Sequence, residues 1–149
     1  MNAPMSTPKG QRRKFWSWGY EGQDIPESEV TSMHERVAKR LGMSDFTILS
    51  DPTLEEIEIR DLRIKPLASL ASFCTTEKWD RVAHTYGKSF RDLAMIYKRK
   101  YPNPPDVVAY PRDEKDIAAV LDWCGENGYA TAPASACASK PFRTPTSTC

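Results

Sequence analysis

The four cysteines are the residues of this chain that would most directly serve as nucleophiles or metal ligands. Cys74, Cys124, Cys137 and Cys149 lie far apart and form no Cys-x-x-Cys pair, whereas a structural zinc site shows closely spaced ligands. Nothing marks the chain as secreted, so we expect free thiols. Cys124 falls on the apolar stripe of an expected helix and has no histidine in local reach, so it is interpreted as a core side chain rather than a nucleophile.

The two histidines and one short motif could in principle bind a metal or a phosphate. His34 and His84 have no nearby cysteine or second histidine, so no metal-binding residue is assigned. Gly87-Lys88-Ser89 matches the end of a phosphate-binding P-loop, but that motif needs a glycine five residues earlier, where this chain has Val82. The motif also needs a preceding strand, and none is indicated. We therefore do not expect binding of a nucleoside triphosphate.

A basic and aromatic segment, Arg12 to Tyr20, could act as a binding arm. It places three cations beside the aromatic residues Phe15, Trp16, Trp18 and Tyr20. Such a segment could stack on nucleic acid or attach to an anionic membrane, or its aromatic side chains could pack onto the body of the protein. We favour packing, because the overall charge of the chain is balanced.

The charge balance and the apolar content restrict the class of protein. Among 149 residues there are 21 Lys and Arg and 20 Asp and Glu, a formal net charge of +1, whereas a dedicated nucleic-acid binder usually shows a clear basic excess. The sequence has no apolar run that could cross a bilayer and no signal-peptide core at its start. We therefore expect a soluble, cytoplasmic protein without a membrane anchor and without a nucleic-acid partner.

Three segments before residue 101 predict helices. The first runs from about Ser28 to Leu41, with an apolar stripe of Val30, Met33, Val37 and Leu41 and with Gly42 as its stop. A second helix is expected to start at Thr53, which stands three residues before Glu56 at capping-box spacing. Residues 75–100 are expected to be helical with a break near Gly87, and Ser89 and Asp92 could cap a helix that buries Leu93, Ile96 and Tyr97.

Residues 102–133 predict a strand–helix–strand unit. Asp106 to Tyr110 indicates a short buried strand, and Asp113 with Asp116 opens a helix. The expected apolar stripe of this helix is Ile117, Val120, Leu121 and Cys124. Gly128 ends it, and Tyr129 to Ala132 can return as a second strand, for which a parallel, right-handed pairing is the default.

The fold class predicted from these elements is α+β. We divide the chain into a flexible basic arm (1–14), a mainly helical N-terminal region (15–101), the βαβ unit (102–133) and a disordered tail (134–149). The tail is almost entirely Ala, Ser, Thr, Pro and Cys and shows no helical or alternating pattern. A two-stranded βαβ unit has too little sheet to be stable alone, so we expect a marginally stable protein that could self-associate through an exposed sheet edge.

Five segments resemble a family of flavoproteins. Pro105–Arg112, Asp116–Cys124 and Asn127–Pro133 are similar to the opening of a vanillyl-alcohol-oxidase type, or PCMH-type, FAD-binding domain. Lys14–Tyr20 and Asp80–Leu93 narrow the resemblance to the N-terminal part of alkylglycerone-phosphate-synthase-like, FAD-linked oxidases. The resemblance extends with gaps from residue 14 to residue 133. It implies that residues 102–133 begin an incomplete FAD-binding domain.

The same resemblance implies where the cofactor site would begin. In this family a glycine-rich Gly-Gly-Gly-Thr-Ser loop that follows Pro133 would hold the pyrophosphate of FAD, and this chain has Ala134-Ser135-Ala136-Cys137 instead. Only Pro133 is carried over as a cofactor-binding residue, and no catalytic residue is assigned. We expect an N-terminal piece of an FAD-dependent oxidoreductase that is inactive alone, with a tail created by a frameshift or a premature stop. The alternative is a non-enzymatic helical interaction module.

Overall fold

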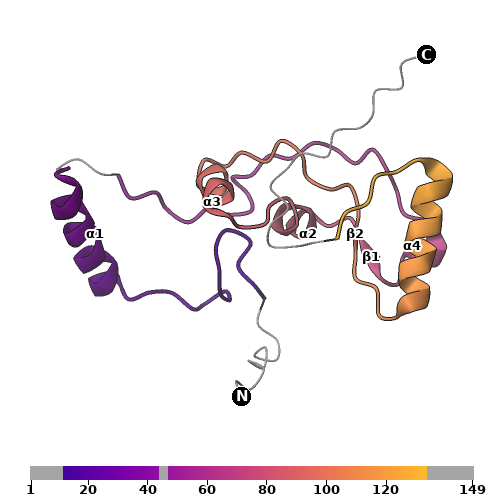
Figure 1. Cartoon of the computed structure of the whole chain (residues 1–149), viewed down its shortest axis with the longest axis horizontal. Helices are drawn as coiled ribbons and strands as arrows, with labels where there is room; N and C mark the ends of the chain where they lie inside the picture. Colours follow the sequence, from indigo (N-terminus) through magenta and orange to yellow (C-terminus); the bar gives the residue numbers. More distant parts are fainter. Residues whose placement is uncertain (1–11, 44–46, 134–149) are drawn as a thin grey trace, which may run out of the picture.

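The described part of the chain has a helix at each end and one small sheet. A computed structural model describes residues 12–43 and 47–133. Its elements are α1 (Glu27–Leu41), the 3-10 turn η1 (Ala68–Leu70), β1 (Cys74–Thr75), α2 (Lys78–Ala83), α3 (Phe90–Tyr97), β2 (Val108–Ala109) and α4 (Glu114–Asn127). In Figure 1, α1 and α4 lie at opposite ends of the molecule, with α2 and α3 between them. The described part of the chain is therefore an α+β fold.

Helix α1 confirms the helix predicted near residues 28–41. It ends at Gly42, which has a φ of 63° and donates its N–H to the carbonyl of Ala38. Glycine adopts this left-handed conformation without the steric cost that a side chain would impose. The predicted apolar stripe is present, yet no residue of α1 is buried. The helix is therefore held by its local sequence and its connections, not by a core.

The helix expected to begin at Thr53 does not form. The side chain of Glu56 accepts a hydrogen bond from the backbone N–H of Thr53 at 2.9 Å, as half of a capping box would predict. The chain nevertheless makes only a turn, and the N–H of Ile57 bonds to the carbonyl of Leu54. Ile57 is completely buried in the core, so tertiary packing extends the chain where local capping favours a helix.

The first core lies around α2 and α3. Its buried members come from five separate segments: Phe15, Ile57, Val82, Ile96 and Tyr101. Leu93 and Tyr97 pack against them, which confirms the predicted apolar face of α3. Ile57 and Ile96 are almost completely inaccessible to solvent, and burial of each contributes roughly 2 kcal/mol.

A capping box begins α3. The side chain of Ser89 accepts from the N–H of Asp92, and the carboxylate of Asp92 accepts from the N–H of Ser89 at 3.0 Å. This confirms the cap predicted from the two residues. Gly87 and Lys88 separate α3 from α2. Lys88 itself has a φ of 60°, an unusual conformation for a residue with a side chain.

The prediction of a parallel βαβ unit is wrong, because the observed sheet is antiparallel. β2 pairs antiparallel with β1, with Cys74 opposite Ala109 and Thr75 opposite Val108. Residues 129–132 are not a strand. The chain leaves α4 through Gly128, and the ring of Tyr129 turns back onto Trp123 with the ring centroids 5.4 Å apart. The strand that pairs with β2 therefore precedes it in the chain and is too short to give an alternating pattern.

Helix α4 has the predicted ends and buries part of the predicted stripe: Cys124 is buried and Val120 packs against the same core. Asp113 caps it by accepting from the N–H of Asp116, and Gly128 ends it in the left-handed conformation. Ile117 and Leu121, which the predicted stripe would bury, are 47% and 53% exposed. The helix contributes Trp123 and Cys124 to a second core, which also contains Leu70 and Phe73. The buried face is narrower than the predicted stripe and is shifted toward Trp123, because η1 contacts α4 on that side.

Candidate functional site

The basic and aromatic segment forms a tight loop against the protein. Arg13 and Tyr20 form an isolated antiparallel bridge, and the N–H of Lys14 donates to the carbonyl of Gly19 at 3.1 Å. The N–H of Glu21 donates to the carbonyl of Arg12 at 2.9 Å. Gly19 has a φ of 91°, which favours glycine at this turn. We call residues 12–21 the N-terminal hairpin.

The aromatic residues of this hairpin pack largely as predicted. Phe15 is buried in the first core, and Trp16 packs against that core with its ring at 75° to the ring of Phe15. The guanidinium of Arg12 lies over Trp79 of α2, 4.4 Å from the ring centroid. This cation–π contact attaches the hairpin to α2. Trp18 alone among the four aromatic residues is largely exposed, at 68%.

Two lysines hold the N-terminal hairpin in place. The ammonium of Lys14, which is buried, donates to Asp24 at 2.7 Å and to the carbonyl of Gln23 at 2.8 Å. The ammonium of Lys88 donates to the carbonyls of Lys14 and Ser17, the latter at 2.8 Å. Burial, with a smaller contribution from nearby Arg13, lowers the pKa of Lys88. The lysine of the Gly-Lys-Ser motif thus binds the chain's own backbone.

A buried carboxylate joins three segments near β2. Asp106 accepts from the guanidinium groups of Arg60 and Arg63, the latter at 2.8 Å, and from the backbone N–H of Arg63 at 3.0 Å. Burial alone would raise the pKa of Asp106, but these hydrogen bonds outweigh it and hold the pKa well below its usual value. From α2, buried Arg81 donates to the carbonyls of Pro105 and Arg60, both at 2.8 Å. We call the side chains of Asp106, Arg60, Arg63 and Arg81 the Asp106 cluster.

The Asp106 cluster was not found from the sequence. Its aspartate stands more than forty positions from the two arginines that bind its carboxylate. No spacing rule connects residues so far apart. The available signal was an acidic side chain at the edge of the apolar run Val107-Val108, where an ionised group requires a partner.

A second polar group surrounds Asp80 of α2. Its carboxylate accepts from the hydroxyl of Tyr110 at 2.7 Å and from the hydroxyl of Thr75 at 3.1 Å. His84 hydrogen-bonds through Nδ1 to the carbonyl of Asp80 at 2.8 Å, and its ring meets the edge of Tyr110. Burial and the bond to Asp80 raise the pKa of Tyr110 far above neutrality. This phenol stays protonated near pH 7, so the group connects α2 to the end of β2 rather than supplying a base.

The remaining candidates from the sequence lie apart from these clusters. Cys124 is buried in the second core and Cys74 is partly buried, and burial raises the pKa of both thiols. Cys74 and Cys124 are free cysteines, whereas Cys137 and Cys149 lie outside the described residues. His34 lies on α1, far along the chain from His84. Within residues 12–43 and 47–133, no three metal-ligating side chains gather.

Pro133, the residue carried over as cofactor-binding, is exposed and is the last residue that the structure describes. The segment Ala134 to Cys149, which stands where a pyrophosphate loop would be, lies outside the described residues. The assignment of Pro133 as a cofactor-binding residue therefore stays a prediction. In the described part of the chain, none of the helices is long and apolar enough to span a membrane.

Comparison with solved structures identifies the fold. The chain superimposes on alkyldihydroxyacetonephosphate synthase with a TM-score of 0.58 and 17% sequence identity, over 78% of this chain and 26% of that one. A second crystal form gives a TM-score of 0.55 and 18% identity, over 86% of this chain and 28% of that one. The fold is shared. The chain spans about a quarter of the length of the structures it matches.

The sequence comparisons add no closer relationship. No family model matches the chain, and no curated protein matches it. The resemblance drawn from the sequence motifs is thus supported at the level of the fold by the structural similarity to alkyldihydroxyacetonephosphate synthase.

Proposed function

We propose that this chain is the N-terminal part of an FAD-dependent, alkylglycerone-phosphate-synthase-like flavoprotein. In this proposal residues 15–101 form a scaffold, and residues 102–133 begin the flavin-binding domain. The observation that carries the proposal is the structural similarity to alkyldihydroxyacetonephosphate synthase over most of the described chain.

Contacts between the motif segments support the proposal. The segment Lys14–Tyr20 and the segment Asp80–Leu93 are the more specific parts of the sequence resemblance. Lys88 of the second segment donates to two carbonyls of the first. Asp80 binds Tyr110, which belongs to the segment that resembles the flavin-domain opening. The segments that carry the resemblance therefore form one packed unit, as pieces of one inherited fold would.

The residues present do not fit FAD. A pyrophosphate is held by backbone N–H groups that glycines leave accessible. The chain continues from Pro133 as Ala134-Ser135-Ala136, so each position carries a side chain that would limit the approach of the phosphates. In a complete relative, FAD would supply the redox or covalent chemistry. For the chain by itself we propose neither FAD binding nor catalysis.

The coding DNA tests this proposal directly. We propose that a frameshift or premature stop replaced the glycine-rich loop, because the composition changes abruptly after Pro133. Translation of the neighbouring frames downstream of the Pro133 codon should yield a glycine-rich loop and then a long flavoenzyme-like remainder. If no frame encodes such a loop and remainder, the frameshift proposal is wrong.

A non-enzymatic helical interaction module is the second candidate function. It is favoured by the apolar stripe of α1, which the described chain leaves uncovered. In that case partner binding without flavin would increase the helix content, which circular dichroism of the purified components would measure. A helix content equal to the sum of the separate components would exclude folding coupled to a partner.

A further inference from the structure

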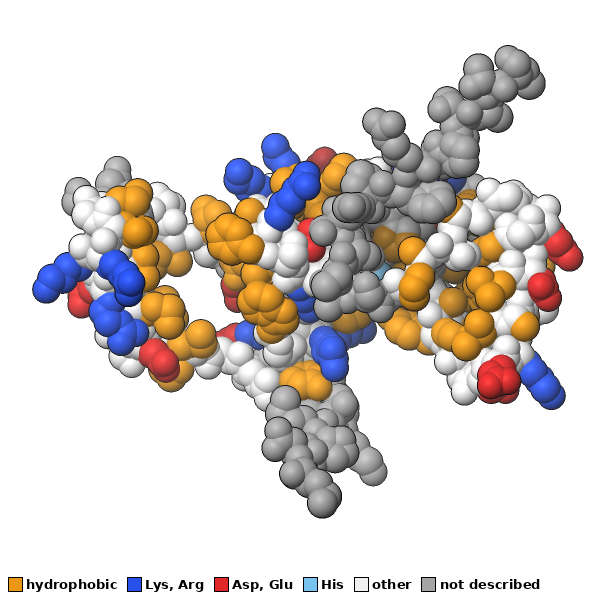
Figure 2. Space-filling model, in the orientation of Figure 1, with side chains coloured by type: hydrophobic (Ala, Val, Ile, Leu, Met, Phe, Trp, Pro, Cys, Tyr) orange, Lys and Arg blue, Asp and Glu red, His pale blue; other side chains and the backbone are white. Residues whose placement is uncertain are grey.

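Two large aromatic side chains lie exposed beside the contact that holds the N-terminal hairpin. Trp18 is 68% exposed, and Phe90, the first residue of α3, is 88% exposed. Lys88 stands two residues before Phe90 and donates to the carbonyl of Ser17, the residue before Trp18, at 2.8 Å. Figure 2 shows hydrophobic side chains on the surface over α3 and the hairpin. Both exposed rings therefore belong to one region of the surface.

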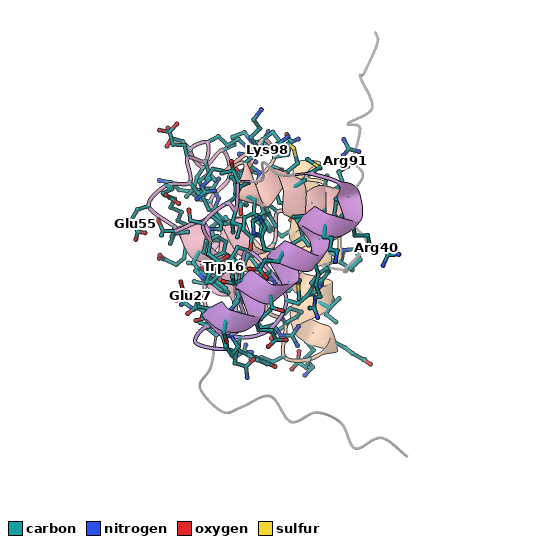
Figure 3. All side chains as sticks on the ribbon, turned by 90° about the vertical axis from the view of Figure 1, so that its left-hand side faces the viewer. Trp16, Glu27, Arg40, Glu55, Arg91 and Lys98 are labelled. Carbon is teal, nitrogen blue, oxygen red and sulfur yellow. The ribbon has the colours of Figure 1, made fainter. Side chains whose placement is uncertain are left out.

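Three exposed arginines adjoin these rings. Arg12 and Arg13 begin the hairpin and each lie over an aromatic ring, and Arg91 follows Phe90 in α3. Figure 3 shows Arg91 projecting at the edge of the molecule. Within residues 12–43 and 47–133, none of these three guanidinium groups pairs with a carboxylate or donates a hydrogen bond. Their N–H groups are therefore available to an anion, and we call Trp18, Phe90 and the three arginines the Trp18–Phe90 surface.

The charge around this surface differs from that of the chain as a whole. Residues 12–24 and 88–92 hold five basic and three acidic side chains, whereas the whole chain has a formal net charge of +1. Two of the three carboxylates are already engaged, because Asp24 pairs with Lys14 and Asp92 is buried in the cap of α3. The Trp18–Phe90 surface therefore has an excess of positive charge, which attracts anions.

We propose that the Trp18–Phe90 surface binds single-stranded nucleic acid, with bases stacked on the two rings and phosphates bound by the arginines. Proteins that bind single strands combine aromatic rings, on which successive bases stack, with cations that follow the backbone. The sequence predicts no nucleic-acid partner from the charge of the whole chain, but association depends on the charge of the contact surface. This inference does not depend on the proposed flavoprotein relationship.

Fluorescence anisotropy with a labelled oligothymidylate of about twelve nucleotides tests the proposal on the full chain. The unsubstituted chain should bind, and its affinity should fall as the salt concentration rises. Trp18→Ala and Phe90→Ala should each weaken binding about tenfold, because each removes a ring on which a base stacks. Trp18→Phe keeps a ring and should retain most of the affinity. Arg91→Ala should weaken binding and make it less sensitive to salt.

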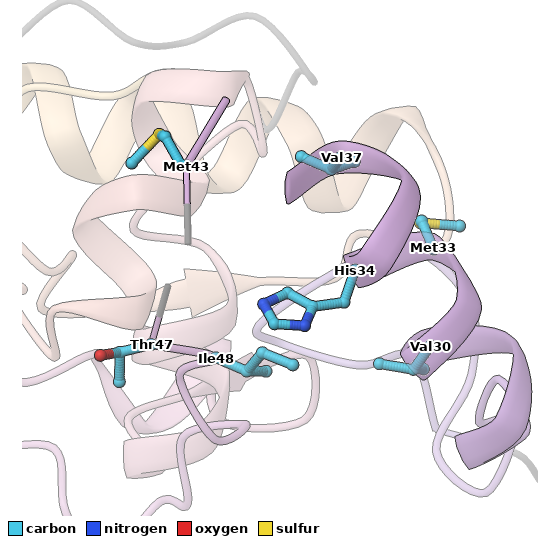
Figure 4. A pocket seen from close by; sticks show the side chains of 7 residues that line it. All are labelled: Val30, Met33, His34, Val37, Met43, Thr47 and Ile48. Atoms are coloured by element: carbon cyan, nitrogen blue, oxygen red, sulfur yellow. The ribbon is translucent and has the colours of Figure 1, made fainter. Parts of the chain in front are cut away.

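The groove beside α1 provides a control for exposed apolar surface. Figure 4 shows Met33, Val30 and Ile48 among the side chains that line it, and none of its described lining residues is a lysine or arginine. Met33 is 44% exposed, so Met33→Ala removes an exposed apolar side chain without touching the Trp18–Phe90 surface. Lys115→Ala is the matched control for charge, since Lys115 is exposed on α4. Both controls should leave the affinity for the oligonucleotide unchanged.

Three results would overturn the proposal. The first is the absence of oligonucleotide binding by the unsubstituted chain. The second is an affinity that survives both Trp18→Ala and Phe90→Ala, or that falls equally in the two control variants. The third is binding to vesicles of phosphatidylserine and phosphatidylcholine but not to the oligonucleotide, which would assign the same side chains to an anionic lipid surface.

Discussion

Asp106 shows how much of this fold depends on a single side chain. Asp106→Asn would remove the charge that Arg60 and Arg63 share and would leave the cations close to Arg81. We expect the free energy of unfolding to fall by about 2 to 3 kcal/mol, because the loss is that of a buried, charge-assisted interaction that is moderated by the exposure of Arg63. Urea denaturation followed by tryptophan fluorescence would measure it.

Asp116 provides the matched control for this substitution. It pairs with Arg112, which stands just before α4, at 2.9 Å, and the Arg112 side chain is 64% exposed. Asp116→Asn should change the unfolding free energy less than Asp106→Asn, because Asp116 binds one largely solvent-exposed arginine, whereas Asp106 binds two arginines. Equal losses in the two variants would show that the Asp106 cluster has no special importance for stability.

The depressed pKa of Asp106 also predicts a dependence on pH. Hydrogen bonds from Arg60 and Arg63 keep the carboxylate ionised in the folded state, while the unfolded residue titrates near 3.9. Its contribution is therefore complete above about pH 5 and is lost progressively as the pH falls below the unfolded value. The unfolding free energy of the unsubstituted chain should fall more steeply on acidification than that of Asp106→Asn. Parallel pH profiles would be inconsistent with a charged Asp106.

At the scale of elements, the cap of α3 is open to a direct test. Ser89→Ala removes the side-chain acceptor for the N–H of Asp92 and should cost about 1 kcal/mol. Ser28→Ala is a suitable control, because Ser28 is exposed in the first turn of α1 and Pro26 occupies the N-cap position. Denaturant unfolding of the two variants would measure the loss of unfolding free energy in each. A stability loss confined to Ser28→Ala would contradict the role of the capping box.

The elements that could be predicted from the sequence are those with local signals at their ends. Gly42 and Gly128 stop α1 and α4, and Ser89 caps α3. Thr53 carries the same kind of signal, yet burial of Ile57 prevents a helix there. The pairing of β2 could not be predicted, because β1 has two residues and its register is set by tertiary contacts.

The shifted face of α4 has a related cause. Periodicity shows that a helix has an apolar side, but not which part of that side a neighbouring element covers. Ile117 and Leu121 fit the periodic stripe and remain exposed, whereas Cys124 of the stripe and Trp123 beside it are buried. The Asp106 cluster was unpredictable for the same reason, since its members meet only after the chain has folded.

At the scale of the whole molecule, the second core crosses the division drawn at residue 101. Leu70 and Phe73 from the N-terminal region pack with Trp123 and Cys124 from the region that follows. The contacts of Arg60 and Arg81 with residues 104–106 connect the same two regions. The scaffold and the start of the proposed flavin domain therefore stabilise each other. This interdependence is compatible with a chain that matches about a quarter of a larger fold.

The proposed function is that of an N-terminal part of a flavoprotein that by itself does not hold FAD. Incubating the purified chain with excess FAD, desalting it and recording the visible spectrum tests the claim most directly. A flavoprotein of known stoichiometry and FAD run without protein serve as the two controls. We predict that no flavin absorbance elutes with the chain. One equivalent of FAD that remains with the protein after desalting would contradict the account.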